Sequence, residues 1–154
     1  MRTLATIAMS ALLVAGCGST EPAAAPSGDP GPWTTLVARA APEVPKHVEA
    51  LGGCDEIATE DDLLRCAIAV GDIDEATTRV DQDLAALGAP PDEIKDRVTR
   101  TREALQEVLS AGDEECFNGA SKVVEAHQCR GMITELRTSL KDLESAYATW
   151  PTTP

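Results

Sequence analysis

The stretch TEDDLLRCAIAVGDIDEATTRVDQDLAALG, residues 59–88, decides the fold class of this chain. Its apolar side chains recur at steps of three and four residues, which is the spacing of one face of an α-helix. Thr59 followed three residues later by Asp62 has the pattern of a capping box, which begins a helix. We expect an amphipathic helix that ends at Gly88 and is kinked at Gly71-Asp72. Its apolar positions are Leu63, Leu64, Ala67, Ile68, Ile73, Ala76, Val80, Leu84 and Leu87.

The same periodicity continues toward the amino terminus of this stretch. Apolar residues from Trp33 to Leu51 step by three and four, and Gly52-Gly53 ends the run. Pro42 and Pro45 lie inside it, and each removes a backbone hydrogen-bond donor. We therefore expect a first helix over residues 33–51 that is kinked or broken at these prolines.

Two further helices are predicted toward the carboxyl terminus. The turn at residues 89–91 leads into a third helix, because Pro91 suits a first helical position. This helix runs toward Cys116, with an earlier end at Gly112-Asp113 as the alternative. After the turn signal Asn118-Gly119, Ser121 is a suitable N-cap for a fourth helix that ends near residue 150. No stretch alternates with period two, so the sequence predicts an all-α, up-down-up-down four-helix bundle over residues 33–150.

The amino terminus carries a different signal. Residues 3–15 form an apolar run behind Arg2 that is too short to cross a membrane, which is typical of a secretory signal peptide. The run closes with Leu13-Val14-Ala15-Gly16-Cys17, which resembles the lipobox of bacterial lipoproteins. The resemblance implies that residues 1–16 are removed and that Cys17 receives a diacylglyceryl group and further acylation, such as palmitate. The alternative is an ordinary secretory peptide with an incidental cysteine.

This resemblance sets the expected location and organisation of the chain. It implies a protein anchored by lipid to the extracytoplasmic face of a bacterial cell membrane. The amino-acid composition, low in Lys and rich in Ala, Arg, Asp and Val, resembles that of actinobacterial proteins. Residues 17–32 hold the lipidated cysteine and a Pro-, Ala-, Gly- and Ser-rich segment that we expect to be a flexible tether. We expect residues 151–154 to be a disordered tail.

The charge of the chain limits its partners. The net charge is −13, and removal of residues 1–16 takes away one basic residue, Arg2, and no acidic one. The mature chain then has 12 Lys and Arg against 26 Asp and Glu, a net charge of −14. Such a surface repels phosphate backbones, and no basic patch is interleaved with aromatic residues. We expect no nucleic-acid partner, and we expect membrane attachment to depend on acyl chains.

Four cysteines remain after Cys17, and an even number in an exported chain predicts two disulfides. Zinc is the alternative, but the spacing lacks the close pairs of zinc motifs. We prefer the local pairs Cys54–Cys66 and Cys116–Cys129, because a loop that folds back can bring each pair within bonding distance. The nested pairing, Cys54–Cys129 with Cys66–Cys116, and the crossed pairing are the alternatives.

Chemical motifs are few. Asp72 and Asp74 have the opening spacing of an EF-hand, but the third ligand position and the required glycine are absent, so we expect no metal site. His47 and His127 are the only groups that titrate near neutral pH, and they lack the spacing of a metal or haem site. No nucleophile motif or phosphate-binding glycine loop is present. We therefore expect neither an enzyme nor a cofactor.

These observations favour a binding or interaction module of the cell envelope. Its expected partner is an unidentified envelope protein or a small ligand. The alternative function is a carrier of a small apolar ligand or haem inside the bundle, with His127 as a ligand contact.

The predicted topology places the aromatic residues Trp33, Tyr147 and Trp150 at one end of the bundle and Phe117 elsewhere. At that end they either plug the core or touch the lipid interface.

Overall fold

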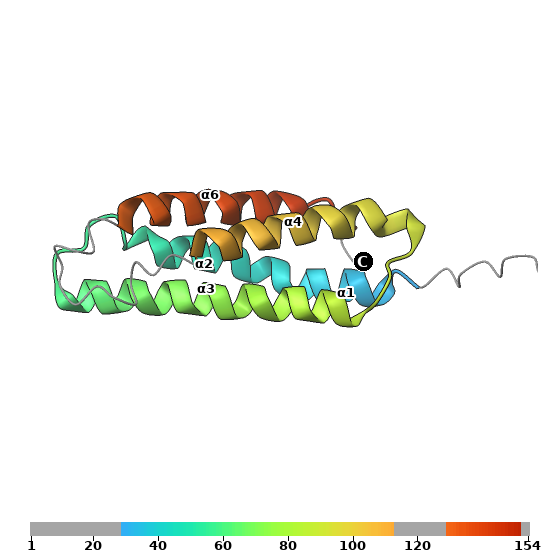
Figure 1. The fold of residues 1–154 in the computed structure, drawn as a ribbon, viewed down its shortest axis with the longest axis horizontal. Coiled ribbons are helices and arrows are strands. Elements are labelled where there is room, and N and C mark those ends of the chain that lie inside the picture. Colours follow the sequence, from blue (N-terminus) through green and yellow to red (C-terminus); the bar gives the residue numbers. More distant parts are fainter. Residues whose placement is uncertain (1–28, 113–128, 152–154) are drawn as a thin grey trace, which may run out of the picture.

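A computed structural model describes residues 29–112 and 129–151 of the chain. These residues form a helical bundle that contains no strand, which confirms the predicted all-α class. Figure 1 shows the helices side by side along the long axis of the molecule. In chain order the elements are α1 (Gly31–Ala40), η1 (Ala41–Glu43), α2 (Val44–Gly52), α3 (Glu60–Ala86), η2 (Asp92–Ile94), α4 (Lys95–Gly112) and α6 (Arg130–Tyr147).

The first predicted helix is broken, as its prolines indicate. One turn of 3-10 helix, η1, contains Pro42 and separates α1 from α2. Pro45 lies in the first turn of α2, where a missing N–H is tolerated because no intrahelical partner exists there. α2 ends at Gly52, within the predicted Gly52-Gly53 stop.

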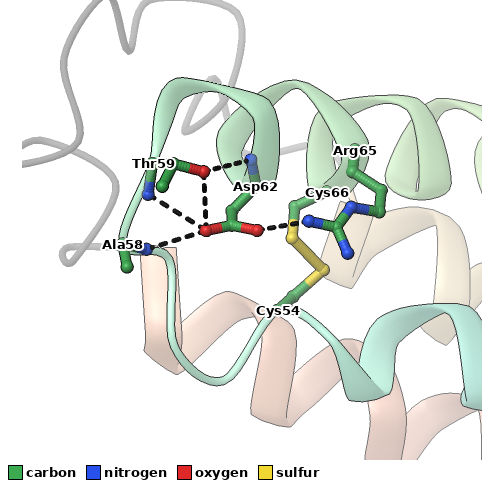
Figure 2. Close-up of polar contacts among 6 residues, drawn as sticks. All are labelled: Cys54, Ala58, Thr59, Asp62, Arg65 and Cys66. Atoms are coloured by element: carbon green, nitrogen blue, oxygen red, sulfur yellow. Dashed lines mark hydrogen bonds and ion pairs between the residues drawn. A yellow bond between two sulfur atoms is a disulfide. The ribbon is translucent and has the colours of Figure 1, made fainter.

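The start of α3 is fixed by the predicted capping box, which Figure 2 shows. The backbone N–H of Asp62 donates to Thr59 Oγ1 at 3.1 Å, and the backbone N–H of Thr59 donates to Asp62 Oδ2 at 3.0 Å. The hydrogen bond from the Thr59 hydroxyl is the main reason why the pKa of Asp62 is lowered. Arg65 pairs with the other carboxylate oxygen of Asp62.

The predicted kink at Gly71-Asp72 is wrong. α3 continues through both residues as α-helix, and Figure 1 shows α3 as a single unbroken helix. Gly71 lies on the exposed side, and nothing would contact a Cβ at this position. A glycine lowers helix propensity by about 1 kcal/mol, but it bends a helix only where packing or a lost hydrogen bond requires a bend.

The turn between α3 and α4 depends on Gly88, whose φ of +81° favours glycine. Pro91 lies one position earlier than predicted. It is the extended N-cap residue of η2, and α4 begins only at Lys95. The predicted course of the chain after Gly112, with Cys116, Asn118-Gly119 and Ser121, lies outside the described residues.

The core draws on every long helix. α6 packs against α4 and α2, and α3 packs against α1, α2 and α4. Arg137 links α6 to the end of α2 and the loop after it by polar contacts. Its Nη2 donates to the backbone oxygen of Leu51 at 2.7 Å, and its Nη1 pairs with Asp55 at 3.0 Å. The largest fully buried side chains include Leu51, Ile73, Leu84, Leu105, Ile133, Leu136 and Leu140. Of the helices described, none has the length and apolar character needed to cross a membrane.

Candidate functional site

The end of the bundle where α2 leads into α3 is closed by a disulfide. Cys54 and Cys66 are bonded, with their Cα atoms 5.6 Å apart, and both side chains are buried. Figure 2 shows this bond next to the capping box. The local pair is therefore confirmed, and the nested and crossed pairings are wrong because each needs Cys54 for another partner. Cys129 is also disulfide-bonded, and Cys116 lies outside the described residues.

The opposite end of the bundle holds the aromatic residues. Figure 1 shows the start of α1 and the end of α6 at the same end of the molecule; Trp33 belongs to the first turn of α1, and Trp150 follows the end of α6. Both indoles are buried, as is the ring of Tyr147. The Nε1 of Trp150 donates to Thr101 Oγ1 of α4 at 3.0 Å. This burial favours the role of a core plug over contact with lipid. Phe117 lies outside the described residues.

A cavity of about 460 Å³ lies beside the proline break. Its lining comes from α1, η1 and α2 on one side and from α3, α4 and α6 on the others. Cavities that bind small molecules have volumes of about 300–1,000 Å³ and a mainly apolar lining. The apolar lining residues are Leu36, Ala40, Val44, Ala76, Val80, Leu105, Leu140, Leu143 and the ring of Tyr147.

The ionised residues of the lining are paired with opposite charges. Arg39 of α1 pairs with Asp83 of α3 at 3.1 Å, and the two side chains are 74% and 43% exposed. Arg79 pairs with Glu75 one turn earlier on α3. Glu43 accepts a hydrogen bond from Lys46 at 2.8 Å, and this bond lowers the pKa of Glu43.

The uncharged polar groups of the cavity are His47, Thr77 and Tyr147. Burial lowers the pKa of His47, and the carboxylates of Glu43 and Asp72 offset part of this effect. Burial raises the pKa of Tyr147, so its hydroxyl stays protonated at neutral pH. Neither hydroxyl, that of Thr77 or that of Tyr147, hydrogen-bonds to any other residue that the structure describes.

The sequence anticipated this site only in part. The carrier hypothesis named His127 as a possible contact, and among the described residues the histidine that lines the cavity is His47. His127 and Cys17 lie outside the described residues. The sequence feature that could have pointed to His47 as a site residue is its position one turn after Glu43, next to the proline break. In residues 29–112 and 129–151, no three His, Cys, Asp or Glu side chains are grouped so that they could hold a metal ion.

Comparison of the chain with protein-family models, with curated proteins and with solved structures finds no match.

Proposed function

We propose that this protein is a lipid-anchored binding module of the bacterial cell envelope, and that it holds a small ligand with an apolar body in the cavity beside the proline break. The observation that carries the proposal is the apolar lining of a cavity with the volume of a small-molecule site. The wall on one side is α1 and α2, which are joined by the single 3-10 turn η1.

A cavity-filling variant tests the binding function. Ala76 of α3 lines the cavity, so Ala76→Leu reduces its volume, whereas Ala85→Leu adds the same side chain at an exposed position of the same helix. A panel of small apolar compounds and haem is screened by the change in melting temperature, because a ligand of the native state raises it by mass action. We expect a compound that stabilises the wild type and Ala85→Leu but not Ala76→Leu. A panel in which every compound shifts all three proteins equally, or none, contradicts the proposal.

Haem is the one compound of the panel whose binding can also be followed by its absorbance spectrum. His and Tyr are both known axial ligands of haem iron, and His47 and Tyr147 line the same cavity. A haem absorbance change that His47→Ala abolishes would identify the carrier function as haem binding. An unchanged spectrum would exclude haem and leave the apolar-ligand function.

The anchor rests on the lipobox-like residues 13–17. Metabolic labelling with palmitate is expected to label the wild type in the membrane fraction, and Cys17→Ala is expected to lose the label. Label that persists in the variant contradicts lipidation at Cys17.

We propose the up-down-up-down order of the four predicted helices together with a second local disulfide, Cys116–Cys129. The placement of the ends of α1 and α6 in Figure 1 supports the order, and the bonded state of Cys129 supports the disulfide. Peptide mapping without reduction is expected to yield a fragment that joins Cys116 to Cys129. A fragment that joins Cys129 to Cys17 contradicts the pairing.

A second candidate function is the binding of an envelope protein. Leu64 and Ile68 of α3 are 60% and 54% exposed and lie one turn apart, so they present an apolar pair to solvent. The test is co-purification from membranes with the full chain and with Leu64→Ser/Ile68→Ser. A partner retained by both proteins rules out this surface as the contact.

A further inference from the structure

The cavity contains two hydroxyl groups that its own walls leave unpaired. Thr77 and Tyr147 are each 5% exposed, and neither side chain makes a hydrogen bond within the described residues. Among the other buried hydroxyls of the described residues, two are paired, and that of Ser139 on α6 makes no hydrogen bond there. Thr34 Oγ1 donates to the Pro30 backbone oxygen at 3.2 Å, and Thr101 Oγ1 accepts from Trp150. Neither oxygen is fully enclosed by protein, so both hydroxyls can be reached from the cavity and are free to hydrogen-bond to a polar atom of a ligand there.

We propose that the ligand is an uncharged amphiphile, with an apolar body and a hydroxyl or carbonyl head that hydrogen-bonds to Thr77 and Tyr147. This inference rests on the proposed function of the cavity and specifies the class of ligand. A hydroxyl both donates and accepts, so the two side chains suit an alcohol or a carbonyl group equally well.

The charges of the lining argue against an ionic head group. The lining contains two arginines, Arg39 and Arg79, and two carboxylates, Glu43 and Asp83, so their formal charges cancel. Each arginine is already paired with a carboxylate, and Glu43 and Asp83 have Lys46 and Arg39 as partners. An ionic head would therefore lose solvation without gaining an unpaired counter-charge.

The net charge of the chain, −13, adds to this preference, because it repels anionic ligands. A cation is attracted to the molecule as a whole, but the lining offers it no free carboxylate. The apolar side chains of Leu36, Leu105, Leu140 and Leu143 come from α1, α4 and α6 and surround the apolar body. An uncharged head on an apolar body matches both sets of contacts.

The test compares three ligands that share one chain and differ in charge: 1-octanol, octanoate and octyltrimethylammonium. Binding to the full chain carrying Cys17→Ala, which has no acyl group, is measured by isothermal titration calorimetry at pH 7.5. Ala76→Leu in the same background measures binding outside the cavity. We expect 1-octanol to bind to the open cavity at least 10-fold more tightly than either charged ligand.

Isosteric variants test the two hydroxyls. Thr77→Val and Tyr147→Phe each remove one hydroxyl and keep the shape of the side chain, so each is expected to weaken 1-octanol binding about 2- to 10-fold. Thr138→Val is the matched control, because Thr138 is exposed on α6 and its hydroxyl bonds to its own helix. We expect the control to bind like the parent.

The outcomes separate this inference from the function on which it rests. If none of the three ligands binds, or if Ala76→Leu binds them all like the parent, the binding function of the cavity is refuted. If a charged ligand binds in the cavity as tightly as 1-octanol, the cavity binds ligands but the uncharged class is wrong. The class is also wrong if Thr77→Val and Tyr147→Phe both bind 1-octanol like the control.

Discussion

Removal of the Cys54–Cys66 disulfide should cost about 3 kcal/mol of unfolding free energy. The bond joins residues 12 apart and so closes a loop of about 13 residues in the unfolded chain. In the chain-entropy treatment, a loop of this size gives about 3 kcal/mol at 25 °C. The proposed variant is Cys54→Ala/Cys66→Ala. A single substitution would instead leave a reactive buried thiol.

The assay is urea unfolding of the wild type and the variant under oxidising conditions. Because alanine also removes two buried sulfur atoms, Cys54→Ala/Cys66→Val serves as a second variant that restores apolar volume on α3. We expect both variants to lose about 3 kcal/mol, with the valine variant slightly more stable. A loss below about 1 kcal/mol in both would refute the loop-closure argument. A normal stability of the valine variant alone would assign the effect to packing.

Three further changes test contacts and charges of the described residues. Arg137→Met removes the donor to the Leu51 carbonyl and should lower the unfolding free energy in urea by about 1.5–3 kcal/mol, whereas a loss under 0.5 kcal/mol would contradict a structural role. Thr101→Val leaves the Trp150 N–H unpaired and should cost about 1–3 kcal/mol, and Trp150→Phe in the same background should recover part of it. The lowered pKa of His47 means that the unfolded chain binds a proton on this residue more readily than the folded chain, so its contribution to stability is full above about pH 6.5 and is lost as the pH falls through the lower folded pKa. His47→Gln should therefore lose less unfolding free energy than the wild type between pH 7 and 5. Identical pH dependences of unfolding free energy for the two proteins would contradict this prediction.

The parts of the fold that the sequence predicted correctly depend on local chemistry. The capping box at Thr59, the break at Pro42 and the stop at Gly52 each follow from hydrogen bonds or sterics within a few residues. Helical periodicity over residues 59–88 is equally local. The error at Gly71 has a physical reason, since the cost of a glycine in a helix is small and the packing of Ile73 and Leu84 on the same helix outweighs it.

The candidate site was less predictable, because it is a property of packing between helices. Residues of α1, α2, α3, α4 and α6 meet at the cavity, and their meeting depends on how the helices are aligned along the bundle. Hydrophobic periodicity shows which face of a helix is turned inward but not whether the space there is filled. The sequence therefore suggested a carrier without locating its cavity, and it did not single out His47 as a lining residue.

Two features of the sequence explain the position of the cavity: the proline break and the short side chains that line it. Hydrophobic periodicity does not distinguish these positions from the rest of the core. Ala40 and Val44 lie on either side of the 3-10 turn that contains Pro42, and both line the cavity. Ala76 of α3 lines it as well, so alanine occurs on both α1 and α3 where a larger apolar residue would fill the space. A core normally packs without voids larger than a water molecule, and a filled core would be more stable. Short side chains beside a proline break, with the hydroxyls of Thr77 and Tyr147 open to the same space, therefore support the proposed ligand site.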